Sequence, residues 1–142
     1  MCCVEGNVYL VGGYDFERVV TKYNSLKNKW ENMPSLQRSR YGASASVCTL
    51  DNKIFVLGGY CSGTTCEMLD LRDDDPHWTY VARMNSVHFG GGVVIERKIY
   101  VLGGNTTVVE VYDADQGILM KYLQMIIFDI YRSVEQSNQH AN

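Results

Sequence analysis

The sequence predicts an all-β protein built from a repeated unit of short antiparallel strands. A pair of glycines closes an apolar run three times, and the pairs lie 46 and 45 residues apart along the chain, at Gly12-Gly13, Gly58-Gly59 and Gly103-Gly104. The ten Tyr, four Phe and two Trp residues favour strands over helices. With 13 Gly and only two Pro, the turns between these strands are expected to depend on glycine.

The apolar runs before the glycine pairs are the clearest strands, at residues 7–11, 53–57 and 98–102. Each run starts with a polar residue, has an aromatic side chain as its second apolar residue and stays apolar up to the glycines. Continuous apolar runs of this length are typical of strands buried on both faces.

Three further segments recur in step with the glycines. Small residues passing into apolar ones at residues 42–48 and 90–95 predict a strand before the run. After the run come a segment with Tyr23, Leu69 or Tyr112 and a last segment with Trp30 or Trp78, where Tyr122 is expected to take the Trp place in the third copy. We expect the two tryptophans to pack over the glycine pairs. A unit of about 45 residues with four antiparallel strands suits a blade of a β-propeller.

The chain divides into three such units and a tail. The expected bounds are residues 4–40 for a first unit that lacks its first strand, 41–86 for a complete second unit, 87–125 for a degenerate third unit and 126–142 for a divergent, disordered tail. Propellers close with typically about 4–8 blades, so three blades predict an open or incomplete propeller. Its end blades would expose apolar faces and strand edges through which the chain could self-associate.

The repeat resembles the kelch repeat, over residues 4 to about 125. The resemblance rests on the glycine pairs with their spaced Tyr and Trp residues. It is closest to the kelch domain of BTB–kelch proteins, through Tyr23, Trp30, Met33 and Pro34 and through Arg40-Tyr41-Gly42. This resemblance implies a kelch-type propeller that binds a protein substrate for a cullin-based ubiquitin ligase, although the chain contains no BTB domain. Two alternatives stay open: an actin-binding kelch protein, and a kelch-type enzyme such as a sugar oxidase or epimerase.

The candidate binding residues lie in loops that antiparallel topology gathers on one side of the blades. In the ubiquitin-ligase kelch domains that the chain resembles, the pocket is lined by the residue before the first strand of each blade and the residue after the glycine pair. Those positions are Arg40 and His88 in the first class, and Tyr14, Tyr60 and Asn105 in the second. Arg40 is the best single candidate because a guanidinium group can hold a carboxylate or a phosphate with two hydrogen bonds.

Charge and composition argue against several other functions. A net charge of −3 leaves no broad basic surface for nucleic acid, and residues 118–131 are too short and too charged to span a membrane. The chain starts with no secretory signal, so its five cysteines are read as free thiols of a cytoplasmic protein. No second Cys/His pair accompanies Cys61 and Cys66, and the three histidines are scattered, so we expect no metal, no cofactor and no catalysis.

Overall fold

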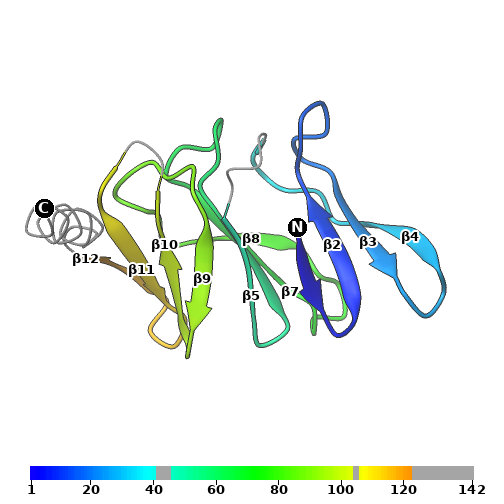
Figure 1. Cartoon of the computed structure of the whole chain (residues 1–142). Coiled ribbons are helices and arrows are strands. Elements are labelled where there is room, and N and C mark those ends of the chain that lie inside the picture. Colours follow the sequence, from blue (N-terminus) through cyan, green and yellow to red (C-terminus); the bar gives the residue numbers. More distant parts are fainter. Residues whose placement is uncertain (41–45, 104–105, 123–142) are drawn as a thin grey trace, which may run out of the picture.

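The computed structural model describes residues 1–40, 46–103 and 106–122, which form three four-stranded antiparallel sheets. The first sheet contains β1 (Cys2–Val4), β2 (Asn7–Val11), β3 (Val20–Asn24) and β4 (Lys29–Met33). The second contains β5 (Ser46–Leu50), β6 (Lys53–Leu57), β7 (Cys66–Asp70) and β8 (Trp78–Val81). The third contains β9 (Gly92–Ile95), β10 (Lys98–Val101), β11 (Val109–Asp113) and β12 (Ile118–Tyr122). In each sheet, neighbours in the chain are neighbours in space, and the sheets stand one after another (Figure 1).

The first unit is complete, so the prediction that it lacks its first strand is wrong. Cys2–Val4 pairs with β2, with Cys2 opposite Tyr9. The two strands are joined by Glu5 and Gly6, which have φ angles of 48° and 74°. Two successive positive φ angles make a tight turn whose twist suits a β-hairpin. The same turn joins β5 to β6 at Asp51-Asn52, where both φ angles are also positive.

The third unit also has its two outer strands, β11 and β12. The residue opposite Tyr112 is Leu119, just as Trp30 lies opposite Tyr23 and Trp78 opposite Leu69. Leu119 therefore takes the Trp position of this sheet. The expectation that Tyr122 takes it is wrong, because Tyr122 pairs with Val109 near the other end of β11.

Two apolar clusters hold neighbouring sheets together. Tyr9, Val20, Ile54, Val56 and Trp78 belong to the cluster between the first and second sheets. Cys48, Phe55, Leu57, Ile99 and Tyr112 belong to the cluster between the second and third sheets. Since the residues of β6 alternate between the two clusters, this strand is buried on both faces, as its apolar run predicts.

Strand β2 differs from β6, although its sequence is equally apolar. Leu10 is 40% exposed, because within the described residues the first sheet packs against a neighbouring sheet on one face only. The three sheets do not close into a ring, which confirms the predicted open arc of four-stranded blades.

Some predictions fall outside the described residues. These are the start of the small-residue strand at residues 41–45, Gly104, Asn105 and the tail after residue 122. Among the described residues, no helix is long and apolar enough to cross a membrane.

Candidate functional site

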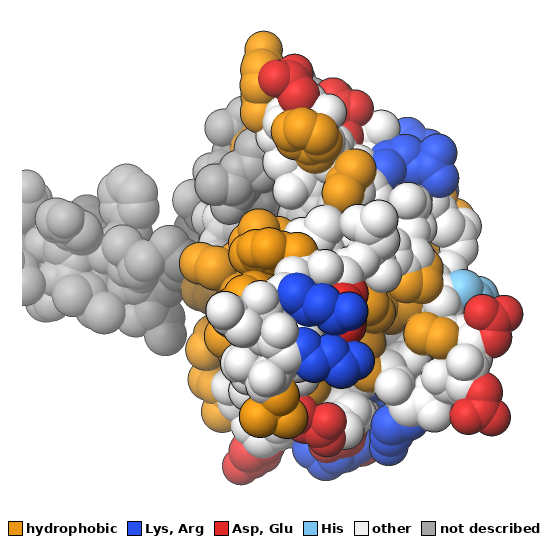
Figure 2. Space-filling model, turned by 90° about the vertical axis from the view of Figure 1, so that its right-hand side faces the viewer, with side chains coloured by type: hydrophobic (Ala, Val, Ile, Leu, Met, Phe, Trp, Pro, Cys, Tyr) orange, Lys and Arg blue, Asp and Glu red, His pale blue; other side chains and the backbone are white. Residues whose placement is uncertain are grey.

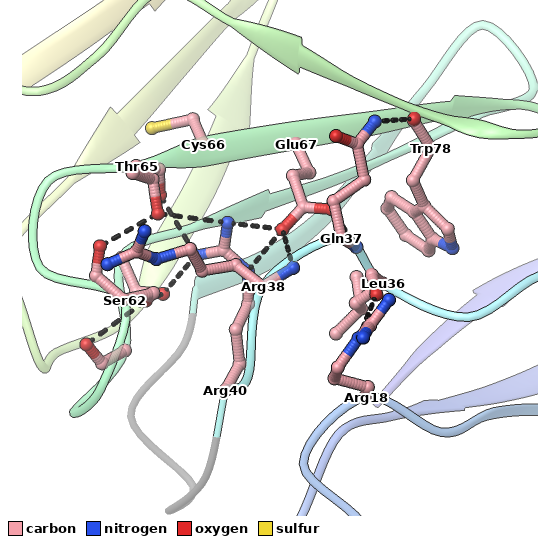
Figure 3. A network of polar contacts seen from close by, with 12 residues as sticks. Arg18, Leu36, Gln37, Arg38, Arg40, Ser62, Thr65, Cys66, Glu67 and Trp78 are labelled. Atoms are coloured by element: carbon pink, nitrogen blue, oxygen red, sulfur yellow. Dashed lines mark hydrogen bonds and ion pairs between the residues drawn. The ribbon is translucent and has the colours of Figure 1, made fainter.

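The connection from the first sheet to the second, residues 34–40, lies on a buried carboxylate. Glu67 on β7 is fully buried, and its two carboxylate oxygens accept hydrogen bonds from the backbone N–H groups of Gln37 at 2.7 Å and Arg38 at 3.2 Å (Figure 3). The indole Nε1–H of Trp78 donates to the carbonyl of Pro34 at 2.9 Å. Polar contacts at both ends therefore fix the path of this connection across the second sheet.

Arg40 ends that connection and is buried, with 1% of its surface exposed. Its Nη2 lies 2.8 Å from Glu67 Oε1, and its Nη1 donates to the carbonyls of Gly58 and Thr65 at 2.5 and 2.9 Å (Figure 3). Its own carbonyl accepts a hydrogen bond from Gly13 N at 3.3 Å. Arg40 thus joins two sheets, its backbone held by the first and its side chain by the second. We call Arg40, Glu67 and the glycine pairs they contact the first joint.

A second joint of the same design connects the second and third sheets through His88. This residue is fully buried, with Nε2 at 3.2 Å from Glu110 Oε1 and Nδ1 at 3.0 Å from the carbonyl of Gly103. The carboxylate of Glu110 also accepts hydrogen bonds from the backbone N–H groups of Asn85 and Ser86 at 2.7 and 2.6 Å. Burial alone would raise the pKa of Glu110, but these hydrogen bonds outweigh burial and lower the pKa below its ordinary value.

The glycine pairs are approached by backbone carbonyls from these joints. A Cβ atom on Gly12 would lie 2.3 Å from the carbonyl oxygen of Arg40, and one on Gly58 would lie 2.7 Å from that of His88. Both glycines also have positive φ angles, 64° and 69°. Close approach of the connecting chain explains why glycine stands here. The structure thus differs from the expectation that tryptophans pack over the pairs.

The two tryptophans differ in their surroundings. Trp78 is 2% exposed and belongs to the cluster between the first and second sheets. Trp30 is 53% exposed and contacts Tyr23, with ring centroids 5.2 Å apart. Trp78 is therefore buried between two sheets, whereas no described sheet covers Trp30.

Sequence reasoning missed Glu67 and Glu110, which organise the two joints. A signal for both is present, since each begins the pattern Glu-x-(Leu/Tyr)-Asp on the third strand of its unit, at residues 67–70 and 110–113. The first sheet has Thr21 at this position, two residues before Tyr23. The carboxylate is thus found in the two sheets that receive a described connection from the sheet before them.

The loops that follow β2 and β6 carry exposed aromatic side chains on one side of the molecule, which we call the loop face. Tyr14 is 78% exposed, Phe16 65% and Tyr60 63%, and the ring of Tyr60 lies 5.7 Å from that of Phe89. Figure 1 shows these two loops at the top of the first and second sheets, and Figure 2 shows hydrophobic side chains at the top beside acidic ones. Of the sequence-predicted site residues, Tyr14 and Tyr60 lie on this surface, Arg40 and His88 are buried in the joints, and Asn105 lies outside the described residues.

The opposite side of the sheets, formed by tight turns, is charged. There Arg97 bridges two turns, with Nη1 at 2.6 Å from Asp51 and Nε at 2.5 Å from Asp115. The acidic turn at residues 73–75 is exposed, as expected for solvated carboxylates. An exposed apolar residue on this side is Leu26, at 96%.

The cysteines are free thiols in the structure. Burial raises the pKa of both Cys48 and Cys66 to about 11, so these two are protonated at neutral pH. Cys61, at the start of the Cys61-x4-Cys66 spacing, is exposed. In the part of the chain that the structure describes, no three His, Cys, Asp or Glu side chains gather as a metal site.

Repeated four-stranded antiparallel sheets, joined at the glycine pair that ends each second strand, define a protein of propeller blades. The family model described as the Kelch motif matches residues 1–37 and 42–85, more than half of the chain, so the chain belongs to the kelch-repeat family.

Curated relatives agree with this assignment. Kelch-like protein 23 of Homo sapiens is 31% identical over 119 residues, which cover 78% of this chain and 21% of that protein. The F-box protein AFR of Arabidopsis thaliana is 27% identical over 124 residues, covering 80% of this chain and 32% of that protein. The chain thus spans about a fifth of the length of Kelch-like protein 23. The similarity to Kelch-like family members implies that the chain is a protein-interaction module.

Proposed function

We propose that the chain is a non-catalytic protein-binding module whose binding surface is the loop face. The observation that carries this proposal is the exposure of Tyr14, Phe16 and Tyr60 in loops on one side of the sheets. Aromatic side chains dominate the energetics of protein interfaces, because they bury a large area and lose little conformational freedom. Isolated apolar residues on a surface need no explanation, but large aromatic side chains gathered on one face mark an interaction site.

In this proposal Arg40 and His88 position the loops. The buried ion pair of Arg40 with Glu67 and the contact of His88 with Glu110 fix the connections that lead toward the loop face. These ionisable groups are engaged within the fold, which supports a binding function over catalysis. Asn105 remains a predicted contact, because it follows the third glycine pair as Tyr14 and Tyr60 follow the first and second.

We also propose the kind of protein that the loop face binds and the compartment in which the chain works. The resemblance to BTB–kelch adaptors supports a bound protein that is a substrate of a cullin-based ubiquitin ligase. We propose a cytoplasmic protein, since its cysteines are free thiols, the state that a reducing compartment maintains.

Affinity purification with quantitative mass spectrometry tests this function. The bait is the wild-type chain, and a triple variant combines Tyr14→Ala, Phe16→Ala and Tyr60→Ala. The control is Leu26→Ala, which removes an exposed apolar side chain from the opposite side. We expect proteins that bind the wild type and the control but not the triple variant. Binding of the same proteins by all three baits, or enrichment of no protein over empty beads, would contradict the proposal.

The identity of the captured proteins separates the partner classes. Cullin-ligase subunits captured together with a substrate would support the ubiquitination role. Actin as the main captured protein, confirmed by co-sedimentation with filaments, would replace it with the cytoskeletal alternative.

A further inference from the structure

The outer face of the first sheet has the composition of a blade interface but no described partner. On this face lie Val8, Leu10, Tyr23 and Trp30, as the strand registers show, because Val8 pairs with Tyr23 and Tyr23 with Trp30. Leu10 and Trp30 are 40% and 53% exposed. The other described residues of this face, Cys3, Thr21 and Asn32, are uncharged. Figure 2 looks toward this end of the molecule and shows hydrophobic side chains exposed below the loops.

The equivalent positions in the second sheet are buried against the first sheet. Leu10 and Val56 each stand two residues before a glycine pair, and Val8 and Ile54 each stand four residues before it. Val56 and Ile54 are 0% exposed and Trp78 is 2% exposed, because all three pack against the first sheet. The outer face of the first sheet is therefore a copy of a surface that elsewhere in this chain receives a preceding sheet, and no described sheet covers it.

The other end of the molecule presents the complementary surface. Val93 and Ile95 on β9 are 46% and 53% exposed. Their equivalents on β5, Cys48 and Leu50, pack against the third sheet. An ion pair repeats beside them, since Lys98 lies 3.9 Å from Asp113 as Lys53 lies 3.4 Å from Asp70.

We propose that two copies of this chain assemble head to tail, with the outer face of the third sheet of each copy packed on the outer face of the first sheet of the other. The contact continues, between chains, the sheet-to-sheet interface that each copy already contains twice. The described residues of each copy supply three sheets, and propellers close with typically about 4–8 blades. Six is the multiple of three within that range, so two copies close the ring and cover both exposed faces. This proposal is independent of the loop-face function.

Analytical ultracentrifugation over a concentration series tests the assembly. The wild-type chain is expected to sediment at twice the mass of one chain. Leu10→Glu places a charge on the first-sheet face and Val93→Glu places one on the third-sheet face, and each variant is expected to be a monomer. Leu26→Glu is the control, because Leu26 lies in the β3–β4 turn outside both faces. Circular dichroism melts establish that the variants are folded.

Mixing the two monomeric variants makes the test specific for a head-to-tail contact. The Leu10→Glu chain keeps its third-sheet face, and the Val93→Glu chain keeps its first-sheet face, so the mixture is expected to form a dimer through one intact contact. A wild-type monomer at all concentrations would overturn the proposal. A dimer that Leu10→Glu breaks and Val93→Glu does not, or a wild type that grows into filaments, would also overturn it.

Discussion

His88 occupies in the second joint the position that Arg40 occupies in the first. Each side chain contacts a buried glutamate, Glu110 or Glu67, and a carbonyl of the following glycine pair. Arginine is always charged, whereas both ring nitrogens of His88 donate only when both carry a proton. The two joints have one geometry but differ in chemistry, since the first contains a permanent cation and the second an imidazole.

Replacing Arg40 should destabilise the chain strongly. Arg40→Met leaves Glu67 buried without its counter-charge, which typically costs about 3–5 kcal/mol in the free energy of unfolding. Urea unfolding measures the loss, with Arg38→Met as the control because the Arg38 side chain is exposed. The double variant Arg40→Met, Glu67→Leu should recover part of the loss, because it removes the buried charge as well. Equal unfolding free energies of Arg40→Met and Arg38→Met would show that the ion pair of the first joint does not stabilise the fold.

The second joint should lose stability in acid. The pKa of Glu110 is lowered in the folded chain, so its contribution to stability is complete above the ordinary carboxyl pKa and is lost as the pH falls through the lowered value. One such proton steepens the dependence of the unfolding free energy on pH by up to about 1.4 kcal/mol per pH unit. Urea midpoints measured from neutral to acidic pH test this, and Glu110→Gln should flatten the dependence. A variant with the wild-type slope would exclude Glu110 as the titrating group.

The two tryptophans should respond differently to truncation. Trp78→Ala removes a side chain buried between two sheets and should cost about 3–5 kcal/mol in unfolding free energy. At chain concentrations too low for self-association, Trp30→Ala removes a half-exposed side chain and should cost less than about 1 kcal/mol. Chemical denaturation of both variants measures the difference. Similar losses at the two positions would mean that Trp30 is also covered in solution, and repeating the experiment at several chain concentrations would then report on self-association.

The fold was predictable because its signals are local and repeated. The apolar runs and the glycine pairs mark β2, β6 and β10 directly, and the period of about 45 residues places the other strands around them. Strand β1 was missed because three residues carry little pattern, although Glu5-Gly6 supplies a hairpin turn. The identity of the Trp-equivalent residue in β12 depends on strand register, which residue spacing alone does not determine.

The candidate site was predictable only in part, for a related reason. Tyr14 and Tyr60 follow the glycine pairs, and the position of loops relative to strands follows from topology. The burial of Arg40 and His88 depends instead on Glu67 and Glu110, which lie 27 and 22 residues further along the chain. The sequence indicates that the guanidinium group of Arg40 can bind a carboxylate. Only the folded structure shows that this carboxylate belongs to Glu67 of the same chain.

Site-specific photo-crosslinking shows whether the loop face is the binding surface. A photoreactive phenylalanine analogue is placed at Phe16 on the loop face or at Leu26 on the opposite side, two positions that are both well exposed. Each chain is irradiated with a partner captured by the wild type. We expect a covalent adduct from position 16 and none from position 26. An adduct from position 26 alone would contradict this expectation and would place binding on the charged turn side of the sheets.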